Sequence, residues 1–538
     1  MRKRVLSFVL ALTMCALFQT TANAYISTYD VQYGDYLYYE INADNTVIIT
    51  GCDGSAVSID IPAQIDGIDV TGIGDYAFYR CADLTSVTIP SSVTSIGNYA
   101  FGGCTYLTSI TIPDSVTSIG NHAFDRCDYL ETVTIPSSVT SIGNYAFYWC
   151  DIETVTIPSS VTSIGNYAFG GCTKLKSIDV DSGNPNYSSL EGNLYNKDKT
   201  EFIQYAMGRE DTHYSIPDSV TSIAEGAFFF CIKLTSITIH AGITSIGRSA
   251  FTDCYGLTNI SVDSDNTSYS SVDGNLFNKD KTTLVQYAIG KADTYYTIPD
   301  SVTSISDCAF ADCGLETVTI PSSVTSIGDE AFSNCFSLTD ITIPNSVISI
   351  GDNGFAGCEG LTSVTMLGGV TTIGSYAFFL CVSLKSVTIP NSIISIGDSA
   401  FGYCDSLTDV YYTGTKAEWN KIKDNGGLYG AVNIHFLGDE PDIKISNVTE
   451  NKSDHSVSAN FQSNSPETQT FEAICAVYDK NGALITYDSQ AVTFDFGEAR
   501  DLTFELSVSD WASCKIFAWD ELGTMRPLSR PALVTHGV

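Results

Sequence analysis

A short pattern of apolar and polar positions recurs through most of the chain. One copy runs from Leu107 to Cys127 and reads LTSITIPDSVTSIGNHAFDRC; its general form is L-x-x-[IV]-x-[IV]-P-x-x-[VI]-x-x-I-x-x-x-A-F-x-x-C. The β-branched residues before the proline alternate inward and outward, which predicts a short strand, and the proline ends it because it cannot donate to a β-ladder. The V-T-S-I-G stretch predicts a second short extended piece. The A-F-x-x-C ending predicts a single helical or 3₁₀ turn whose Ala, Phe and Cys face inward.

The spacing of this pattern predicts a solenoid. Its Phe-x-x-Cys ending occurs twelve times at intervals of 22 or 23 residues, except for two intervals of 59 residues. A coil of this length cannot bury its apolar side alone, so stacked coils must bury it together. We therefore expect about twelve coils with parallel strands, in which each inward position forms a column. The cysteines of the resulting ladder are Cys81, Cys104, Cys127, Cys150, Cys172, Cys231, Cys254, Cys313, Cys335, Cys358, Cys381 and Cys404.

The cysteine ladder admits two interpretations. Cα atoms of neighbouring coils would lie about 5 Å apart, which is within the range of a disulfide. However, in-register side chains point in parallel, which is poor geometry for a bridge, and a buried free cysteine behaves as a small hydrophobic residue. We expect free, packed thiols rather than disulfides. No metal site is expected, since Cys and His ligands do not converge at short spacings.

The string IPSSVTSIGNYAFGGC, residues 157–172, resembles the BspA-like leucine-rich repeat family. The resemblance extends from Ile59 to Leu437. It implies a leucine-rich repeat solenoid in a bacterial secreted or cell-surface protein, with adhesion to host matrix or to other cells as its role. The family has no catalytic residues that could be carried over to this chain.

The first residues have the features of a secretory signal peptide. Arg2, Lys3 and Arg4 precede an apolar run, and Ala22–Ala24 makes a small-x-small cleavage site, so we expect cleavage near Ala24. The apolar run is too short to span a membrane. A lipid anchor at Cys15 is the alternative, but Met14 occupies a position that requires a small residue. The expected domains are a signal peptide (1–24), an N-terminal β cap (25–57), the repeat solenoid (58–437) and a C-terminal domain (438–538).

Related inserts fill the two long intervals, near residues 178–208 and 260–290. Each contains an N-K-D-K-T turn between apolar runs, which predicts a β-hairpin. Such inserts often mark the binding face of a repeat protein, although they can also be inherited decoration. Their acidic openings resemble calcium loops, but the glycine and the bidentate glutamate of such loops are missing. We therefore interpret these acidic residues as solvated turn residues.

The last hundred residues have no repeat. From Pro441 onward, apolar and polar residues alternate in several segments, which predicts a small all-β, sandwich-like domain. Cys475 and Cys514 lie in two of these segments, and the sequence leaves open whether they form a disulfide or are simply buried.

Charge and motifs narrow the function classes. The net charge is −35, and loss of the signal peptide takes it to −38. Such an acidic surface repels phosphates and anionic lipids, so we expect no nucleic-acid partner and no membrane insertion after cleavage. The six histidines show no metal spacing, and neither a nucleophile elbow nor a phosphate-binding loop is present. We expect no enzyme activity, cofactor or metal.

Two outward columns are candidate partner-binding surfaces: Thr88, Thr111, Thr134 and Thr156, and Tyr76, Tyr99, Tyr145 and Tyr167 with His122. Exposed strands favour threonine without any partner, and tyrosines can pack between coils. The leading hypothesis is a secreted or cell-surface module that binds extracellular proteins. Glycan binding through the aromatic column is the alternative, followed by an ice-binding threonine array and by a structural surface protein without a specific ligand. The sequence does not identify the oligomeric state.

Overall fold

The computed structural model describes residues 31–34, 36–425, 428, 432–436, 443–451, 455–463, 468–480, 484–495, 497–506, 513–519 and 532–535. The expected signal peptide lies outside these residues. The chain divides after Lys291 into two units, which are described separately below. Within the described residues, no helix is long and apolar enough to cross a membrane.

The first unit begins with an antiparallel sheet of three strands, β1 (Val31–Tyr33), β2 (Leu37–Ile41) and β3 (Val47–Cys52). Strand β3 then pairs in parallel with β6 (Ile68–Ile73). The inward residues of β2 and β3, Leu37, Tyr39, Val47 and Ile49, are buried. The cap therefore covers the open end of the first coil, as a solenoid requires.

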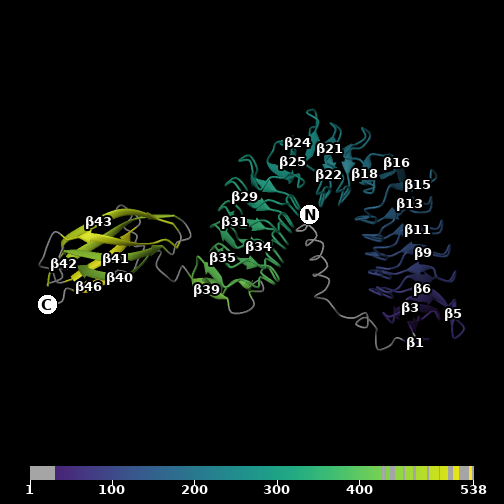
Figure 1. Cartoon of the computed structure of the whole chain (residues 1–538), viewed down its shortest axis with the longest axis horizontal. Coiled ribbons are helices and arrows are strands. Elements are labelled where there is room, and N and C mark those ends of the chain that lie inside the picture. Colours follow the sequence, from purple (N-terminus) through teal and green to yellow (C-terminus); the bar gives the residue numbers. More distant parts are fainter. Residues whose placement is uncertain are drawn as a thin grey trace. The chain divides into compact units, whose positions relative to one another are not determined.

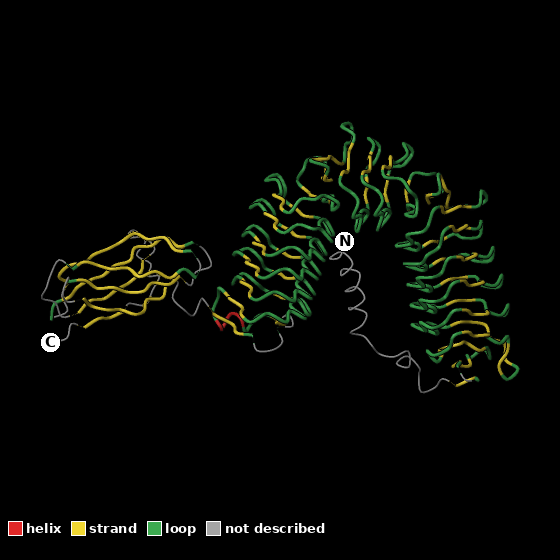
Figure 2. Tube along the Cα trace, viewed as in Figure 1, coloured by secondary structure: helices red, strands yellow, loops and turns green. Residues whose placement is uncertain are grey.

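Each regular coil contributes one short and one longer strand, and both kinds pair in parallel with strands of neighbouring coils (Figures 1 and 2). The short strands of the first coils belong to one continuous sheet, whereas the longer strands of these coils pair two by two. The longer strands carry one buried Val or Ile between exposed neighbours, and adjacent coils pair in register, as in Thr132 with Ser109. They are β4 (Ser58–Asp60), β7 (Ser86–Thr88), β9 (Ser109–Thr111), β11 (Thr132–Thr134), β13 (Thr154–Ile157) and β15 (Ser177–Val180). The short strands are β8 (Ser95–Ile96), β10 (Ser118–Ile119), β12 (Ser141–Ile142) and β14 (Ser163–Ile164). The expected solenoid of parallel strands is confirmed.

The A-F-x-x-C segment is a run of β-turns, so the expected helical or 3₁₀ turn is wrong. In one coil, the N–H of Gly102 donates to Tyr99 O at 3.0 Å and that of Cys104 donates to Phe101 O at 3.1 Å. The N–H of Phe101 instead donates to Ala123 O of the next coil at 2.7 Å. Tyr99 has φ of 53°, which lies outside the helical region. Along this segment, N–H groups that bond within the turn alternate with N–H groups that bond to the next coil. In a helix, successive N–H groups would all bond within the same segment.

Phenylalanine and cysteine form the inward columns of the stack. The rings of Phe101 and Phe124 lie 5.2 Å apart and nearly parallel, and both side chains are fully buried. The Cys127 thiol donates to Phe101 O at 3.2 Å. The same bond, from thiol to the phenylalanine carbonyl of the preceding coil, is made by Cys104, Cys150, Cys172, Cys254, Cys335, Cys358, Cys381 and Cys404. The cysteine is therefore both a core residue and a hydrogen-bond donor between coils.

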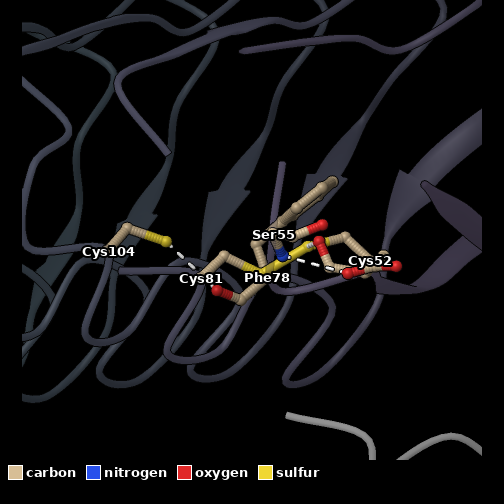
Figure 3. Close-up of a disulfide and its surroundings, with 6 residues drawn as sticks. Cys52, Ser55, Phe78, Cys81 and Cys104 are labelled. Atoms are coloured by element: carbon tan, nitrogen blue, oxygen red, sulfur yellow. Dashed lines mark hydrogen bonds between the residues drawn. A yellow bond between two sulfur atoms is a disulfide. The ribbon is translucent and has the colours of Figure 1, made fainter. Parts of the chain in front are cut away.

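The first cysteine of the ladder departs from the expected free thiol. Cys81 forms a disulfide with Cys52 of strand β3, as Figure 3 shows beside the free thiol of Cys104. The repeat begins at the coil of Phe78, so no preceding Phe-x-x-Cys coil offers Cys81 a carbonyl. The other eleven cysteines of the ladder are free. The disulfide therefore links the cap to the first coil.

The two inserts fold as the expected hairpins. The first contains β16 (Tyr187–Leu190), β17 (Asn193–Asn196) and β18 (Glu201–Gln204), and the second contains β24 (Tyr269–Val272), β25 (Asn275–Asn278) and β26 (Thr283–Gln286). Neighbouring strands within each insert are antiparallel. Strand β18 also pairs in parallel with β20 (Ser222–Ile223), so the first insert is built into the solenoid sheet. The other strands of this unit are β5 (Gln64–Ile65), β19 (His213–Ser215), β21 (Ser236–Ile239), β22 (Ser245–Ile246) and β23 (Asn259–Val262).

The second unit begins with further coils of the same design. Its longer strands are β27 (Tyr295–Thr297), β29 (Thr317–Thr319), β31 (Asp340–Ile343), β33 (Ser363–Met366), β35 (Ser386–Ile389), β37 (Asp409–Tyr412) and β39 (Asn433–Phe436). Its short strands are β28 (Ser304–Ile305), β30 (Ser326–Ile327), β32 (Ser349–Ile350), β34 (Thr372–Ile373), β36 (Ser395–Ile396) and β38 (Lys423–Asn425). Helix α2 (Lys416–Trp419) follows β37, and Thr415 and Glu418 form its capping box.

The C-terminal domain consists of two antiparallel sheets with a shared core. One sheet contains β40 (Ile443–Asn451), β41 (Ser456–Ser463) and β44 (Ala499–Glu505). The other contains β42 (Gln469–Tyr478), β43 (Leu484–Phe494), β45 (Ser513–Trp519) and β46 (Ala532–Thr535). Phe461 and Phe504 of the first sheet pack in one buried cluster with Phe471 and Phe494 of the second. The expected sandwich-like domain is confirmed.

Candidate binding surfaces

The threonines of the first candidate column lie on an exposed sheet face. Thr88, Thr111, Thr134 and Thr156 occupy equivalent outward positions on β7, β9, β11 and β13. A second outward position on the same strands holds exposed Ser or Thr, so each strand presents two hydroxyl groups. Strand spacing places successive rows about 4.8 Å apart. The result is a rigid, regular face that is rich in hydroxyl groups.

Another threonine column has a structural role instead. Thr117 Oγ1 donates to the carbonyl of Thr94 in the preceding coil at 3.2 Å, and Thr140 makes the same bond to Thr117 at 3.1 Å. Thr162 continues the series. The frequent threonines of the repeat therefore include residues that join coils and residues, such as Thr111, that face solvent.

The tyrosine column is a stack of rings. Ring centroids are 5.0 Å apart between Tyr76 and Tyr99, 4.3 Å between Tyr99 and His122, 4.7 Å between His122 and Tyr145, and 5.0 Å between Tyr145 and Tyr167. All neighbouring planes lie within 8° of parallel. The half-buried rings therefore present edges, and a sugar cannot stack on a ring face inside this column. Burial also raises the pKa of the Tyr99 hydroxyl.

His122 replaces a tyrosine in the middle of this stack and takes a polar partner. Its Nδ1 lies 2.9 Å from an Asp125 carboxylate oxygen, three residues along the chain. A histidine ring is narrower than a tyrosine ring but has the same planar shape, so it preserves the column. The aromatic column is thus chiefly a packing device between coils.

A neighbouring aromatic row was not predicted from the sequence. It occupies the two variable positions of Phe-x-x-Cys, where the glycine pair 170–171 lies between the aromatic pairs 148–149 and 229–230 of the neighbouring coils. A Cβ at Gly171 would meet the Trp149 ring at 2.8 Å, so the glycine makes room for that ring. The Trp149 ring then reaches Phe230, with centroids 4.5 Å apart. The glycine pair between two aromatic pairs was the available signal in the sequence.

Tyr106 and Tyr129 form an exposed aromatic pair that sequence reasoning also missed. Each is 51% exposed, and their rings stack with centroids 5.5 Å apart. Each follows a ladder cysteine by two residues, so the repeat places them in adjacent coils. Exposed tyrosines combine a large apolar area with a hydroxyl group, which is typical of protein-binding surfaces.

A shallow polar groove follows the Ser-Ile-Gly-Asn segments. It has a volume of about 330 Å³ and is lined by Asn98, Ser118, Asn121, Ser141, Asn144 and Ser163, among others. The N–H of Asn121 donates to Asn98 Oδ1 at 2.8 Å, and that of Asn144 donates to Asn121 Oδ1 at 2.8 Å. A Cβ at Gly120 would lie 2.5 Å from the Gly97 carbonyl carbon, so glycine allows the coils to approach closely.

In each insert, a lysine ammonium group binds backbone carbonyls of the acidic turn. Lys197 Nζ donates to the carbonyls of Ser182 and Asn184, and Lys279 makes equivalent bonds in the second insert. Asn184 is fully buried, and its amide donates to Val161 O at 2.9 Å. Asp181 Oδ1 accepts the N–H of Gly183 at 2.8 Å, as a turn residue does. No group of three or more potential metal ligands is present in the described parts of the chain.

Comparison with known proteins identifies the family. The model of the BspA type leucine-rich repeat region matches residues 71–187, 207–289 and 290–408, more than half of the chain. The chain is a member of the BspA-type leucine-rich repeat family. The resemblance expected from the repeat is therefore confirmed. No curated protein matches the chain significantly.

Several solved bacterial structures resemble this BspA-type protein. A leucine-rich cell surface protein of Faecalibacterium prausnitzii is 35% identical over 75% of this chain and all of its own, with a TM-score of 0.42. A leucine-rich repeat protein of Bacteroides ovatus is 26% identical over 71% of this chain and 99% of its own (TM-score 0.32). The pneumococcal vaccine antigen PcpA is 20% identical over 75% of this chain and 92% of its own (TM-score 0.36). These whole-chain TM-scores are low, so the family assignment rests on the sequence match.

Proposed function

We propose that this BspA-type protein is exported and binds extracellular or cell-surface proteins through the solenoid of residues 58–291. The main supporting observation is the exposed hydroxyl face of strands β7 to β13, in which equivalent strands repeat from coil to coil and β9 pairs with β11 in register. A rigid face loses little conformational entropy when a partner binds, which favours affinity. The signal-peptide pattern and the cell-surface relative of Faecalibacterium prausnitzii support the location.

A binding experiment with matched charge insertions tests this proposal. The mature chain is screened against purified extracellular matrix proteins and bacterial surface proteins, with a glycan array in parallel. Affinity for the protein that binds is then measured for the double variant Thr111→Glu/Thr134→Glu. We expect a loss of at least about tenfold, because two carboxylates would be desolvated in the interface.

Thr319→Glu/Thr342→Glu is the control, since these threonines hold equivalent exposed positions on β29 and β31. It should leave the affinity unchanged. Equal losses in both variants would show that the effect is not specific to the proposed face. Binding to glycans without binding to any protein would contradict the proposal.

A further inference from the structure

Hydrogen bonding explains why the ladder cysteines stay reduced in the solenoid. The thiols of Cys104, Cys127 and Cys150 donate to phenylalanine carbonyls of the preceding coil at 3.1–3.2 Å. A thiol held in this way is directed at an oxygen rather than at the next sulfur along the column. Burial also raises the pKa of these thiols, which disfavours the thiolate needed for disulfide exchange.

Cys313 and Cys335 are an intermediate case. Their sulfur atoms lie 3.2 Å apart, but the Cys335 thiol also donates to Phe310 O at 3.2 Å. The carbonyl bond of the ladder is thus retained by one member of this pair. This pair can therefore be compared with a pair of neighbouring cysteines in which neither thiol donates to a carbonyl.

Cys475 and Cys514 of the C-terminal domain form a pair in which neither thiol bonds a carbonyl, unlike Cys313 and Cys335. Their sulfur atoms lie 2.9 Å apart, and in the described residues neither thiol has another hydrogen-bond partner. Both side chains are fully buried in the core between the two sheets. Each thiol therefore faces a sulfur atom and no carbonyl.

The strand pairing places the two side chains on the same face of the sheet. In the antiparallel pair of β42 and β45, Cys475 is opposite Ile516, and Cys514 is opposite Val477. The cysteines are thus diagonal neighbours, separated by one step of two residues. Diagonal neighbours are on average more widely spaced than disulfide partners, so the short distance between the sulfurs shows that these two side chains converge.

We propose that Cys475 and Cys514 form a disulfide in the exported protein, which cross-links strands β42 and β45. The bridge would close a loop that spans 39 residues of the domain. Exported proteins meet the oxidising conditions under which such a bridge persists.

The oxidation requires a disulfide donor, either an exported dithiol–disulfide carrier or a small-molecule disulfide. The thiolate of one of the two cysteines attacks one sulfur of the donor, forms a mixed disulfide and releases the first donor thiol. The other cysteine then loses its proton and attacks the cysteine sulfur of the mixed disulfide, which releases the second donor thiol. Two cysteine thiols are thereby oxidised and one donor disulfide is reduced. Because both cysteines are buried in the finished domain, the exchange occurs while the strands are pairing.

Mass spectrometry of the mature chain tests the proposal. The protein is refolded in a mixture of reduced and oxidised glutathione, free thiols are alkylated under denaturing conditions, and the digest is analysed without reduction. We expect one linked peptide pair containing Cys475 and Cys514, beside the pair containing Cys52 and Cys81. We expect alkyl groups on Cys104 and Cys127. Alkylated Cys475 and Cys514 would overturn the proposal.

The thermal stability of the C-terminal domain gives a second measurement. Reduction with dithiothreitol should lower its unfolding midpoint by roughly 10 °C, because the reduced unfolded chain gains conformational freedom. The double variant Cys475→Ala/Cys514→Ala should lose this dependence on reductant. The matched control Cys52→Ala/Cys81→Ala should retain it. Equal sensitivity to reductant with and without Cys475 and Cys514 would contradict the proposed bridge.

Discussion

The coils of the two units share their inward columns and differ in their outward ones. Phe101 and Phe124 of the first unit stack with centroids 5.2 Å apart, and Phe332 and Phe355 of the second stack at 4.9 Å. The residue two positions before the core phenylalanine, however, is aromatic in the first five coils of the first unit and mixed in the second unit, where it is Cys308, Glu330, Asn353, Tyr376 or Ser399. The backbone at this position is left-handed in both units. Stacking thus constrains the backbone and the core, but not the outer side chain.

The polar residue that follows the Ile-Gly pair of each coil also differs between the units: the examples below are asparagines in the first unit and aspartates in the second. Asn98 Oδ1 accepts the N–H of Asn121 at 2.8 Å, and Asp329 Oδ1 accepts that of Asp352 at 2.9 Å. The two side chains make the same bond between coils. The asparagines add amide donors to the surface, whereas the aspartates add negative charge. Outer columns can therefore diverge between units without any change in the fold.

The largest expected effect comes from the shared core. Phe124→Ala removes a fully buried ring from the stack, and Phe355→Ala does the same in the second unit. Each should lower the free energy of unfolding by about 3–5 kcal/mol, because the neighbouring coils cannot close the cavity. Denaturant unfolding of each variant measures this loss. A large loss in only one unit would show that the cores are not equivalent.

Glycine substitution tests the close approach of coils. Gly120→Ala places a Cβ 2.5 Å from the backbone of Gly97 and should cost about 2–3 kcal/mol through strain. Gly314→Ala is the control, since no heavy atom lies within 4 Å of its added Cβ. Thermal unfolding should therefore separate the two variants clearly. Similar midpoints would argue against tight packing along the groove.

The aromatic column predicts a smaller difference between the units. Tyr145→Asn removes a ring that stacks on both His122 and Tyr167, at a cost of about 1–2 kcal/mol. The reverse change at the equivalent position, Asn353→Tyr, should alter stability by no more than about 0.5 kcal/mol. Chemical denaturation of the pair checks this asymmetry. Equal effects would mean that the ring stack contributes little.

The smallest effect is a pH dependence within the first insert. Asp211 accepts hydrogen bonds from Arg209 and Tyr205, and the bond from Arg209 is the main reason that its pKa is below the usual 3.8. The carboxylate therefore stabilises the fold above pH 3.8, and this contribution disappears as the pH falls through the lowered pKa. Hydrogen exchange near residues 205–211 should rise a few-fold, beyond its intrinsic pH dependence, between pH 5 and strong acid. The variant Asp211→Asn should lack this additional rise.

The sequence predicted features that follow from the repeat. Period, strand positions and inward columns emerged from the Leu107–Cys127 pattern, since every coil must satisfy the same packing rules. It did not reveal the β-turns around Tyr99, because their left-handed residues are ordinary amino acids rather than glycine. The turns of the inserts predicted their hairpins. The sequence did not predict that the Lys197 ammonium binds backbone carbonyls of a loop 13 to 15 residues earlier in the chain.

The cysteines show where sequence information ends. Their period assigned most of them to a buried column, and the sequence correctly indicated free thiols for eleven of the twelve. Only the tertiary structure showed that nine of these thiols donate to a phenylalanine carbonyl of the coil before them, and that Cys81 has no such coil and bridges to Cys52. It also brought Cys475 and Cys514 to 2.9 Å. A periodic pattern specifies what repeats, whereas the ends of the array and the unrepeated domain depend on contacts between distant segments.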